Sequence, residues 1–484
     1  MNYKMMGRFT AQILLMEGIF LIPAMFISLV CGEDAAVCGF LVTLGVIALL
    51  GIPMYLFCRD AKSAFYATEG MMCVAMSWFV LSLIGALPFY ISGAIPGYID
   101  ALFETVSGFT TTGASILPEV ESMAKGLLYW RSFTHWVGGM GVLVFLLAIA
   151  PTKGSEQGFT MHLLRAESPG PSVGKLVPKM RKTAGILYLL YIILTAVDFV
   201  LLLLGNMPVL DALCTAFGTA GTGGFGIKND SIASFSPYIQ NVTTVFMLLF
   251  GVNFSCYYLL TLRQVKSVFK DEELRLYIGI VLGSIALIVW NLWGYYPSFG
   301  ETLRHAAFQV SSVITTTGYA TTDFDLWPSF SKTILLCLMV VGACAGSTGG
   351  GIKVARVLLL FKSLRRNIAQ MLHPRKIQVI RNNDAVVSER VVANTNAYLS
   401  AYVVILFVSF MLISLDGFSV GTNFSAVLSC LNNIGPGVEL VGPTCNFGIF
   451  GAFSKIVLIL DMLLGRLEIF PILVLFSYQT WKNA

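Results

Sequence analysis

Long apolar segments alternate with short segments rich in threonine and glycine along most of the chain, which predicts a helical membrane protein. The first two apolar runs are Phe9–Val30 and Ala36–Phe57, and each reaches the roughly 20 residues that cross the hydrocarbon core of a bilayer. A signal peptide has an apolar core of only roughly 7–15 residues. Because the first run is longer than that and a second run follows at once, we expect an uncleaved first helix.

After these two runs the chain repeats one unit four times: an apolar helix, a shorter amphipathic helix, a Thr/Gly-rich turn and a second apolar helix. We expect the short helices near Tyr98–Phe109, Val209–Thr219, Thr302–Ile314 and Phe424–Leu431. They are too short to cross, and backbone that re-enters at membrane depth must be buried in protein or line a wet cavity. Each lies between an inbound and an outbound helix. This order predicts four parallel repeats around one axis, rather than the inverted repeats of many transporters.

The unit also sets the expected boundaries, with about ten full spans in all. We expect the two extra helices within residues 1–65, repeat 1 at 66–152, repeat 2 at 183–263, repeat 3 at 264–362 and repeat 4 at 391–484, with linkers at 153–182 and 363–390.

Composition and charge agree with a membrane location. Hydrophobic residues make up 56% of the chain and charged residues 12%, whereas soluble domains carry about 25% charged residues. Basic residues gather in Lys4–Arg8, Arg59–Lys62, Lys153–Lys182, Arg263–Lys270 and Lys353–Arg390. By the positive-inside rule these segments and the N-terminus are cytoplasmic. Topology thus explains the net charge of +5, and we expect no nucleic-acid partner.

Each short helix is followed by a loop that contains a glycine. The candidate residues are Thr111, Thr112 and Gly113; Thr222, Gly223 and Gly224; Thr316, Thr317 and Gly318; and Asn433, Ile434 and Gly435. Glycine tolerates the dihedral angles that turn successive carbonyls toward one axis, and a ring of carbonyl oxygens can replace the hydration shell of a cation. The short helices would also aim the negative ends of their dipoles at the centre. The alternative is that these small residues serve helix packing.

Two features mark a candidate control region. The segment Gly342–Lys353 interrupts a helix that begins near Lys332 and resumes near Ile352; its candidate residues are Gly346, Ser347, Thr348, Gly349, Gly350 and Gly351. Five glycines in Gly342–Gly351 break the helix, since each costs about 1 kcal/mol relative to alanine. The alternative is a kink or a tight packing site.

Arg466 is the second feature, because it lies in the apolar run Ile456–Phe476, where a charge suggests a functional role. Alternatively, the Arg466 side chain reaches the membrane–water interface, or it pairs with Asp461 or Glu468. We expect Arg131 and His135 at the membrane interface. No nucleophile–base pair or metal-ligand cluster stands out in the spans, so an enzyme is disfavoured.

The four loops, the segment Gly342–Lys353, Arg466 and the two added N-terminal helices together resemble the Trk/Ktr/HKT superfamily of potassium transporters, and within it the bacterial TrkH-type subunits. The resemblance covers essentially the whole chain. It implies an all-α integral membrane protein with four pseudo-symmetric helix–pore loop–helix repeats plus two N-terminal transmembrane helices. In such a protein the four glycines select potassium, and glycine at the first position (Gly113) favours potassium over sodium. The resemblance also implies that the four glycine-bearing loops form a selectivity filter. The segment Gly342–Lys353 and Arg466 would then lie below this filter and obstruct the path of the ion.

The resemblance further implies a bacterial inner-membrane homodimer, surrounded by membrane lipid, with one pore per protomer. Its regulator is a separate cytoplasmic ring of nucleotide-binding RCK domains of the TrkA type. The transported ion is K⁺ (and Rb⁺), with no organic cofactor in the chain itself. A different reading is a secondary transporter that couples potassium to protons or sodium. It requires an essential intramembrane carboxylate, for which Asp198, Asp461 and Glu468 are candidates.

Overall fold

The computed structural model describes residues 2–61, 67–139, 141, 180–375, 378–383, 385–478 and 482. In this part of the chain the regular structure is helical apart from one two-stranded hairpin, β1 (Arg381–Asn382) and β2 (Ala385–Val386). The all-α membrane fold expected from the sequence is therefore confirmed.

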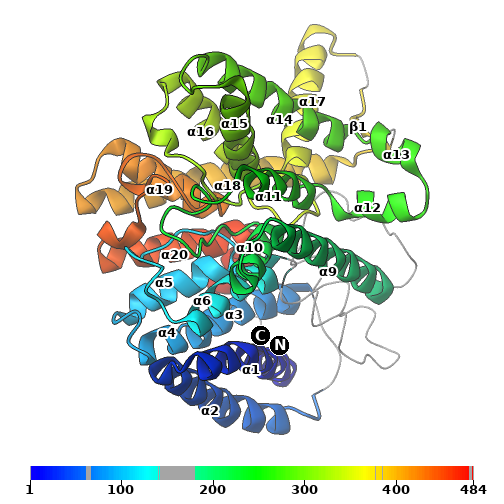
Figure 1. Cartoon of the computed structure of the whole chain (residues 1–484). Coiled ribbons are helices and arrows are strands. Elements are labelled where there is room, and N and C mark those ends of the chain that lie inside the picture. Colours follow the sequence, from blue (N-terminus) through cyan, green and yellow to red (C-terminus); the bar gives the residue numbers. More distant parts are fainter. Residues whose placement is uncertain are drawn as a thin grey trace.

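Two N-terminal helices, α1 (Tyr3–Cys31) and α2 (Asp34–Phe57), form an antiparallel pair. Helix α1 ends because Gly32 adopts a left-handed conformation with φ 73°, which glycine tolerates without steric cost. The pair packs against repeat 1, where α1 contacts α3 and α6 and α2 contacts α4 (Figure 1).

The first two repeats follow the expected order. Repeat 1 consists of α3 (Ala67–Gly85), α4 (Leu87–Ile91), the short helix α5 (Tyr98–Phe109) and α6 (Lys125–Gly139). Repeat 2 consists of α9 (Met180–Leu204), the short helix α10 (Val209–Gly221), α11 (Pro237–Phe250) and α12 (Phe254–Thr261), with α13 (Val265–Lys270) after it.

The last two repeats have the same plan. Repeat 3 consists of α14 (Glu272–Asn291), the short helix α15 (Phe299–Ile314), α16 (Ser329–Val341) and α17 (Val354–Leu372). Repeat 4 consists of α18 (Glu389–Ile413), the short helix α19 (Val420–Asn432), α20 (Ala452–Arg466) and α21 (Phe470–Phe476). Single 3₁₀ turns lie at Phe324–Leu326, Ser414–Asp416, Glu439–Val441 and Phe447–Ile449.

The four repeats close into a ring around one axis. In each repeat the helix after the short helix packs against the short helix of the next repeat: α6 on α10, α11 on α15, α16 on α19, and α20 back on α5. The parallel arrangement predicted from the chain order follows from this closure.

Two short helices begin earlier than the sequence pattern suggested. Helix α15 starts at Phe299 rather than Thr302 because the Ser298 hydroxyl accepts the Glu301 N–H at 3.2 Å. Helix α19 starts at Val420 rather than Phe424 because the Ser419 hydroxyl accepts the Thr422 N–H at 3.1 Å. Such N-caps fix a helix start independently of the apolar pattern.

The second helices of repeats 2, 3 and 4 are broken. Helices α11 and α12 meet at an angle of 89°, residues Gly342–Lys353 separate α16 from α17, and Leu467–Ile469 separate α20 from α21. Six helices of the described chain are long and apolar enough to cross a membrane, or seven if the bent pair counts as one span. The expected total of about ten counted the second helix of all four repeats as a continuous span. Three of these helices are broken, and the fourth, α6, is described only up to Gly139.

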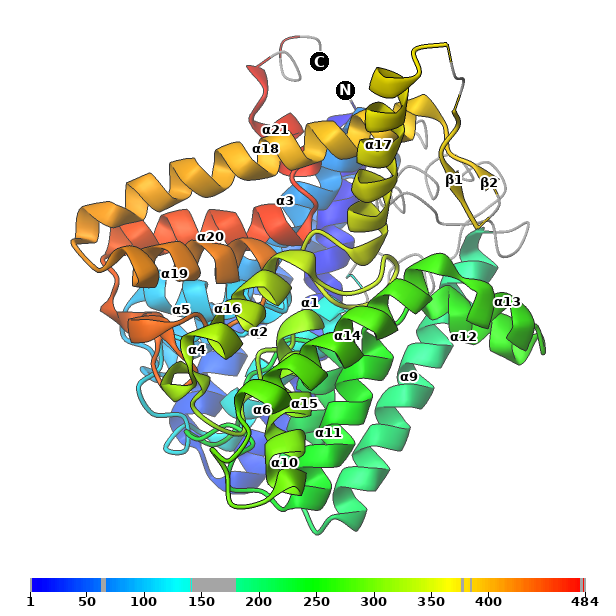
Figure 2. The same cartoon turned by 90° about the horizontal axis from the view of Figure 1, so that it is seen from above.

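The expected linkers 153–182 and 363–390 each overlap a described helix. Residues 153–179 lie outside the described residues, and α9 begins at Met180. Helix α17 extends into the expected linker 363–390, as Figure 2 shows beside the β1–β2 hairpin. This end of the molecule carries the basic segments Arg263–Lys270 and Lys353–Arg390.

Candidate functional site

The four short helices end in the same backbone turn. In repeat 1, the N–H of Thr111 donates to the carbonyl of Gly108 at 3.1 Å and the N–H of Thr112 donates to that of Ser107 at 2.8 Å. The matching pairs recur after α10, α15 and α19, which makes each end a Schellman turn. The first residue of each loop is left-handed, with φ 54° at Thr111, 52° at Thr222, 58° at Thr316 and 56° at Asn433.

We call the segments Thr111–Gly113, Thr222–Gly224, Thr316–Gly318 and Asn433–Gly435 the glycine loops. Each ends on a glycine with a positive φ: 79° at Gly113, 75° at Gly224, 84° at Gly318 and 103° at Gly435. A residue with a side chain rarely adopts these angles. Each glycine loop thus begins and ends on a residue with positive φ, and the residue between them does not have one.

The glycine loops contact one another in cyclic order. A Cβ on Gly113 would lie less than 3.0 Å from the carbonyl oxygen of Gly223, one on Gly224 from that of Thr317, and one on Gly318 from that of Ile434. The ring closes at Gly435, whose Cβ would lie 2.9 Å from the carbonyl oxygen of Thr112. Four equivalent carbonyls therefore lie against four equivalent glycines.

A cavity of about 120 Å³ opens above this ring. All four loop glycines line it, together with the chain segments that leave the loops. The charged residues on its wall include Arg131 and Lys228. One face of the ring is thus accessible from outside the protein.

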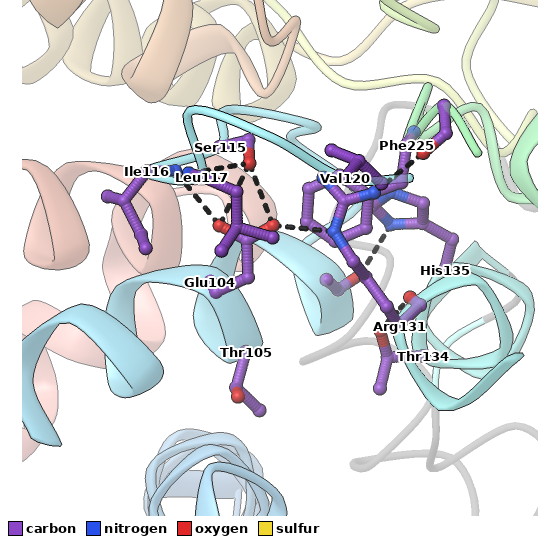
Figure 3. A network of polar contacts seen from close by, with 12 residues as sticks. Glu104, Thr105, Ser115, Ile116, Leu117, Val120, Arg131, Thr134, His135 and Phe225 are labelled. Atoms are coloured by element: carbon purple, nitrogen blue, oxygen red, sulfur yellow. Dashed lines mark hydrogen bonds and ion pairs between the residues drawn. The ribbon is translucent and has the colours of Figure 1, made fainter. Parts of the chain in front are cut away.

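An ion pair behind the ring joins α5 to α6, as Figure 3 shows. The Nε of Arg131 donates to Glu104 Oε1 at 2.6 Å, and both side chains are buried. Glu104 also accepts the N–H of Ile116 at 3.0 Å, and Arg131 donates to the carbonyl of Gly226 at 2.9 Å. This network anchors the chain where it leaves the glycine loops of repeats 1 and 2.

His135 lies one helical turn further along α6 and connects the same two repeats. Its Nδ1 donates to the carbonyl of Gly108 at 2.7 Å, and its Nε2 accepts the N–H of Phe225 at 3.2 Å (Figure 3). A carbonyl only accepts and an amide N–H only donates, so His135 is the neutral Nδ1–H tautomer. The expectation that Arg131 and His135 lie at the membrane interface is wrong, because both are buried against the loops.

Residues Gly342–Lys353, which we call the interrupting loop, lie directly against the ring on the side away from the cavity. The N–H of Gly350 donates to Thr316 Oγ1 at 2.6 Å. A Cβ on Gly349 would lie 2.9 Å from the carbonyl oxygen of Thr315, and one on Gly350 less than 3.0 Å from that of Asn432. The backbone approaches the ends of α15 and α19 this closely because these positions carry no side chain.

The remaining candidate residues of the interrupting loop fix it to α11 and α12. The Thr348 Oγ1 donates to the carbonyl of Phe250 at 3.3 Å, and the carbonyl of Gly346 accepts the N–H of Phe254 at 3.0 Å. Ser347 donates to the carbonyl of Cys344 at 2.6 Å within the loop. Gly346 and Gly351 have φ values of 71° and 73°, which places them where glycine is favoured.

Arg466 at the end of α20 joins the interrupting loop to repeat 1. Its Nη1 donates to the carbonyl of Thr348 at 2.9 Å, and its Nη2 donates to the carbonyls of Gly138 and Gly139, the latter at 2.8 Å. A guanidinium is suited to this role because its planar donors reach several acceptors at once.

The carboxylates considered for ion coupling occupy three different environments. Glu468 forms a buried ion pair with Arg356, and Asp461 accepts the Ser409 hydroxyl at 2.7 Å. Asp198 is fully buried, and neither of its carboxylate oxygens has a hydrogen-bond partner among the described residues.

Comparisons with known proteins point to one family. The family model TrkH, described as cation transport protein, matches residues 40–482. The Trk system potassium uptake protein TrkH of Escherichia coli strain K12 is 36% identical over 477 residues, covering 97% of both chains. That of Halomonas elongata is 34% identical over 490 residues, covering 100% of both. The crystal structure of the potassium transporter TrkH from Vibrio parahaemolyticus matches with a TM-score of 0.88 and 32% identity, covering 99% of this chain and 100% of that chain.

Proposed function

The chain belongs to the TrkH family of cation transport proteins, and we propose that it is the potassium uptake pore subunit of a Trk-type system. It is a multi-pass membrane protein of a transport family rather than an enzyme. The observation that carries the proposal is the closed ring of glycine loops, in which the carbonyls of Thr112, Gly223, Thr317 and Ile434 recur in equivalent positions.

In this proposal the loops form the selectivity filter for K⁺ and Rb⁺. Carbonyl oxygens take the place of the water that a cation loses on entering, and the C-terminal ends of α5, α10, α15 and α19 add negative potential at the same centre. The Glu104–Arg131 pair and His135 hold the backbone of the loops in place, so that carbonyl spacing is set before the ion arrives.

We propose that the interrupting loop and Arg466 form the gate. The loop lies between the ring and the basic end of the molecule, and its contact with Thr316 leaves it in the path of an ion that has passed the filter. The charge of Arg466 would repel a cation there. Moving the loop aside requires breaking a small set of hydrogen bonds. They include the bond from Arg466 to the carbonyl of Thr348, the bond of Gly350 to Thr316, and those that fix the loop to α11 and α12.

The distribution of basic residues and the names of the relatives support a proposal for the membrane orientation and the partners of this protein. We propose that the basic end faces the cytoplasm of a bacterial cell, with the chain in the inner membrane and its N-terminus inside. The relatives are named as Trk system proteins, which supports a cytoplasmic TrkA-type nucleotide-binding partner. A homodimer with one pore per protomer completes the proposal.

The alternative function is potassium transport coupled to protons or sodium. The observation that favours it is Asp198, a buried carboxylate without a hydrogen-bond partner among the described residues. A coupled mechanism needs such a group to exchange a proton or a sodium ion. Asp461 and Glu468 support it less, since both have partners.

Flux into proteoliposomes tests both functions. We expect the purified protein to pass K⁺ and Rb⁺ much faster than Na⁺, with a rate that does not change when a proton or sodium gradient is imposed. Equal fluxes of K⁺ and Na⁺ would exclude the filter assignment. A rate that follows the imposed gradient and falls in Asp198→Asn would establish the coupled alternative instead.

A further inference from the structure

Glu273, in the first turn of α14, holds the two ends of the interrupting loop together. Its Oε1 accepts the N–H of Ala345 at 2.5 Å and the N–H of Ala355 at 3.2 Å. Ala345 lies near the start of the loop, and Ala355 is the second residue of α17. A single buried side chain from a different helix therefore bridges both sides of the break.

The Glu273 carboxylate accepts a backbone N–H in the first turn of α17, where the residue before the helix supplies no side-chain cap. The residue before α17 is Lys353, which makes no capping hydrogen bond and has the unusual φ of 69° for a lysine. Its Nζ donates to the carbonyl of Gly349 instead. A carboxylate at a helix N-terminus accepts orphan N–H groups and interacts favourably with the helix dipole. Glu273 supplies this cap from α14.

The same turn of α14 is fixed to the β1–β2 hairpin. Asn383, in the turn of the hairpin, accepts the N–H of Glu272 at 2.9 Å and donates to Asp271 Oδ2 at 2.7 Å. Lys362 of α17 pairs with Glu272 and donates to the carbonyl of Arg381 at 2.7 Å. Figure 2 shows the hairpin beside α17, at the end of the molecule that carries the basic segments.

Three consecutive acidic residues thus connect two distant parts of the chain. Asp271 and Glu272 bind the hairpin, while Glu273 binds the interrupting loop. Residues in the first turn of one helix move together, because the helical backbone is stiff over such a short distance. A displacement of Asn383 is therefore transmitted to the carboxylate that bridges Ala345 and Ala355.

We infer that Glu273 is the positioning residue of the interrupting loop, and that Asn383 is the contact through which an event at the cytoplasmic surface reaches it. Pulling the hairpin away rotates the first turn of α14, withdraws the carboxylate and leaves two N–H groups without acceptors. The loop then leaves the filter. The inference rests on the proposed role of this loop as the gate.

Hydrogen exchange gives a test that does not depend on transport. In the full-length protein, Glu273→Ala should speed amide exchange in residues 342–356 about tenfold or more, and Asn383→Ala should do so to a smaller extent. Glu273→Gln retains a carbonyl acceptor without the charge and should fall between wild type and Glu273→Ala. The matched control is Glu389→Gln, another first-turn glutamate in an ion pair, with Arg366, at the same end of the molecule. In Glu389→Gln, amide exchange in residues 342–356 should be as slow as in the wild-type protein.

Rubidium flux in the same proteins supplies the functional test. We expect Glu273→Ala and Asn383→Ala to raise flux severalfold without the cytoplasmic partner, and Glu389→Gln to leave it unchanged. Unaltered exchange and flux in Glu273→Ala would overturn the inference, and an effect of Glu273→Ala without any effect of Asn383→Ala would overturn the link to the hairpin. Failure of wild-type protein to pass Rb⁺ would instead contradict the proposed function. If Glu273→Ala aggregates on size-exclusion chromatography, Glu273→Gln decides the outcome.

Discussion

At the scale of single residues, the first residue of each glycine loop has a strained left-handed backbone, and the last residue has a backbone conformation that glycine adopts easily. Thr111, Thr222 and Thr316 are left-handed, a conformation that costs about 1–2 kcal/mol for an ordinary L-residue and is rare for a β-branched one. Strain of this kind persists only where the surroundings over-determine it. Here the Schellman turns and the contact of Thr316 with Gly350 do so.

Replacing a ring glycine by alanine tests the filter assignment. Gly224→Ala adds a Cβ at φ 75° that would overlap the carbonyl of Thr317, so Rb⁺ flux should fall about tenfold, as a change of about 1.4 kcal/mol implies. Gly283→Ala in α14 is the control, since nothing lies within 4 Å of its added Cβ. Equal flux in the two variants would remove Gly224 from the pathway.

Arg466 carries the second prediction at this scale. Arg466→Ala removes donors to the carbonyls of Thr348, Gly138 and Gly139, and hydrogen bonds from charged groups contribute about 1.5–3 kcal/mol each. Rb⁺ flux without the partner should therefore rise severalfold. Arg466→Lys keeps the charge but lacks the planar set of donors, and should give an intermediate flux. A flux at the wild-type level in Arg466→Ala would show that this residue does not hold the gate.

At the scale of elements, the second helix of each repeat packs against the short helix of the next repeat, and α6 also holds the ends of the glycine loops beside it. Helix α6 presents Arg131 and His135 on one face. These side chains bind α5 at Glu104 and Gly108 and the exit of the repeat 2 glycine loop at Phe225 and Gly226. Helices α11, α16 and α20 are broken at the level of the interrupting loop. The break frees backbone groups that α17, Glu273 and Arg466 then bind.

The Glu104–Arg131 pair should be essential for the attachment of α5 to α6. Breaking a buried ion pair on one side costs about 3–5 kcal/mol, so Glu104→Gln should lower the thermal unfolding midpoint markedly in detergent. The exposed pair between Arg366 and Glu389 provides the control, because surface pairs contribute about 0–1 kcal/mol. Similar midpoints for Glu104→Gln and Glu389→Gln would contradict this role.

Much of this arrangement was predictable from the sequence, because its signals are local. The glycine loops, the interrupting loop and the position of α5 follow from glycines and apolar spacing within short windows. Arg131 and His135 were misplaced because their acceptors, Glu104 and Gly108, lie 27 residues away in each case. Spacing within one helix shows that they share a face, but the sequence does not say what that face meets.

At the scale of the whole molecule, one side of the ring opens to a cavity and the interrupting loop lies against the other side. The basic segments lie beyond the loop. The turn between α1 and α2 and the segment around Cys445 belong to the other end, which faces the outside of the cell in the proposed orientation.

Native cysteines allow this orientation to be tested. A membrane-impermeant maleimide added to intact spheroplasts should label Cys31 and Cys445, which are exposed, and should not label the buried Cys214. Because Cys445 lines the cavity, a bulky adduct there should also reduce flux, and Cys445→Ser should protect against that loss. Labelling of Cys31 only after membrane permeabilisation would reverse the assigned orientation.

All four glycine loops belong to one polypeptide chain, and this has a consequence for how the ring can change by mutation during evolution. In a pore made of four identical chains, one codon change alters all four quarters of the ring at once. Here each quarter has its own codons, and the fourth already reads Asn433, Ile434 and Gly435 where the first reads Thr111, Thr112 and Gly113. The closure at Gly435, where an added Cβ would lie 2.9 Å from Thr112, is the least crowded. Inherited variation in selectivity should therefore accumulate first at that junction.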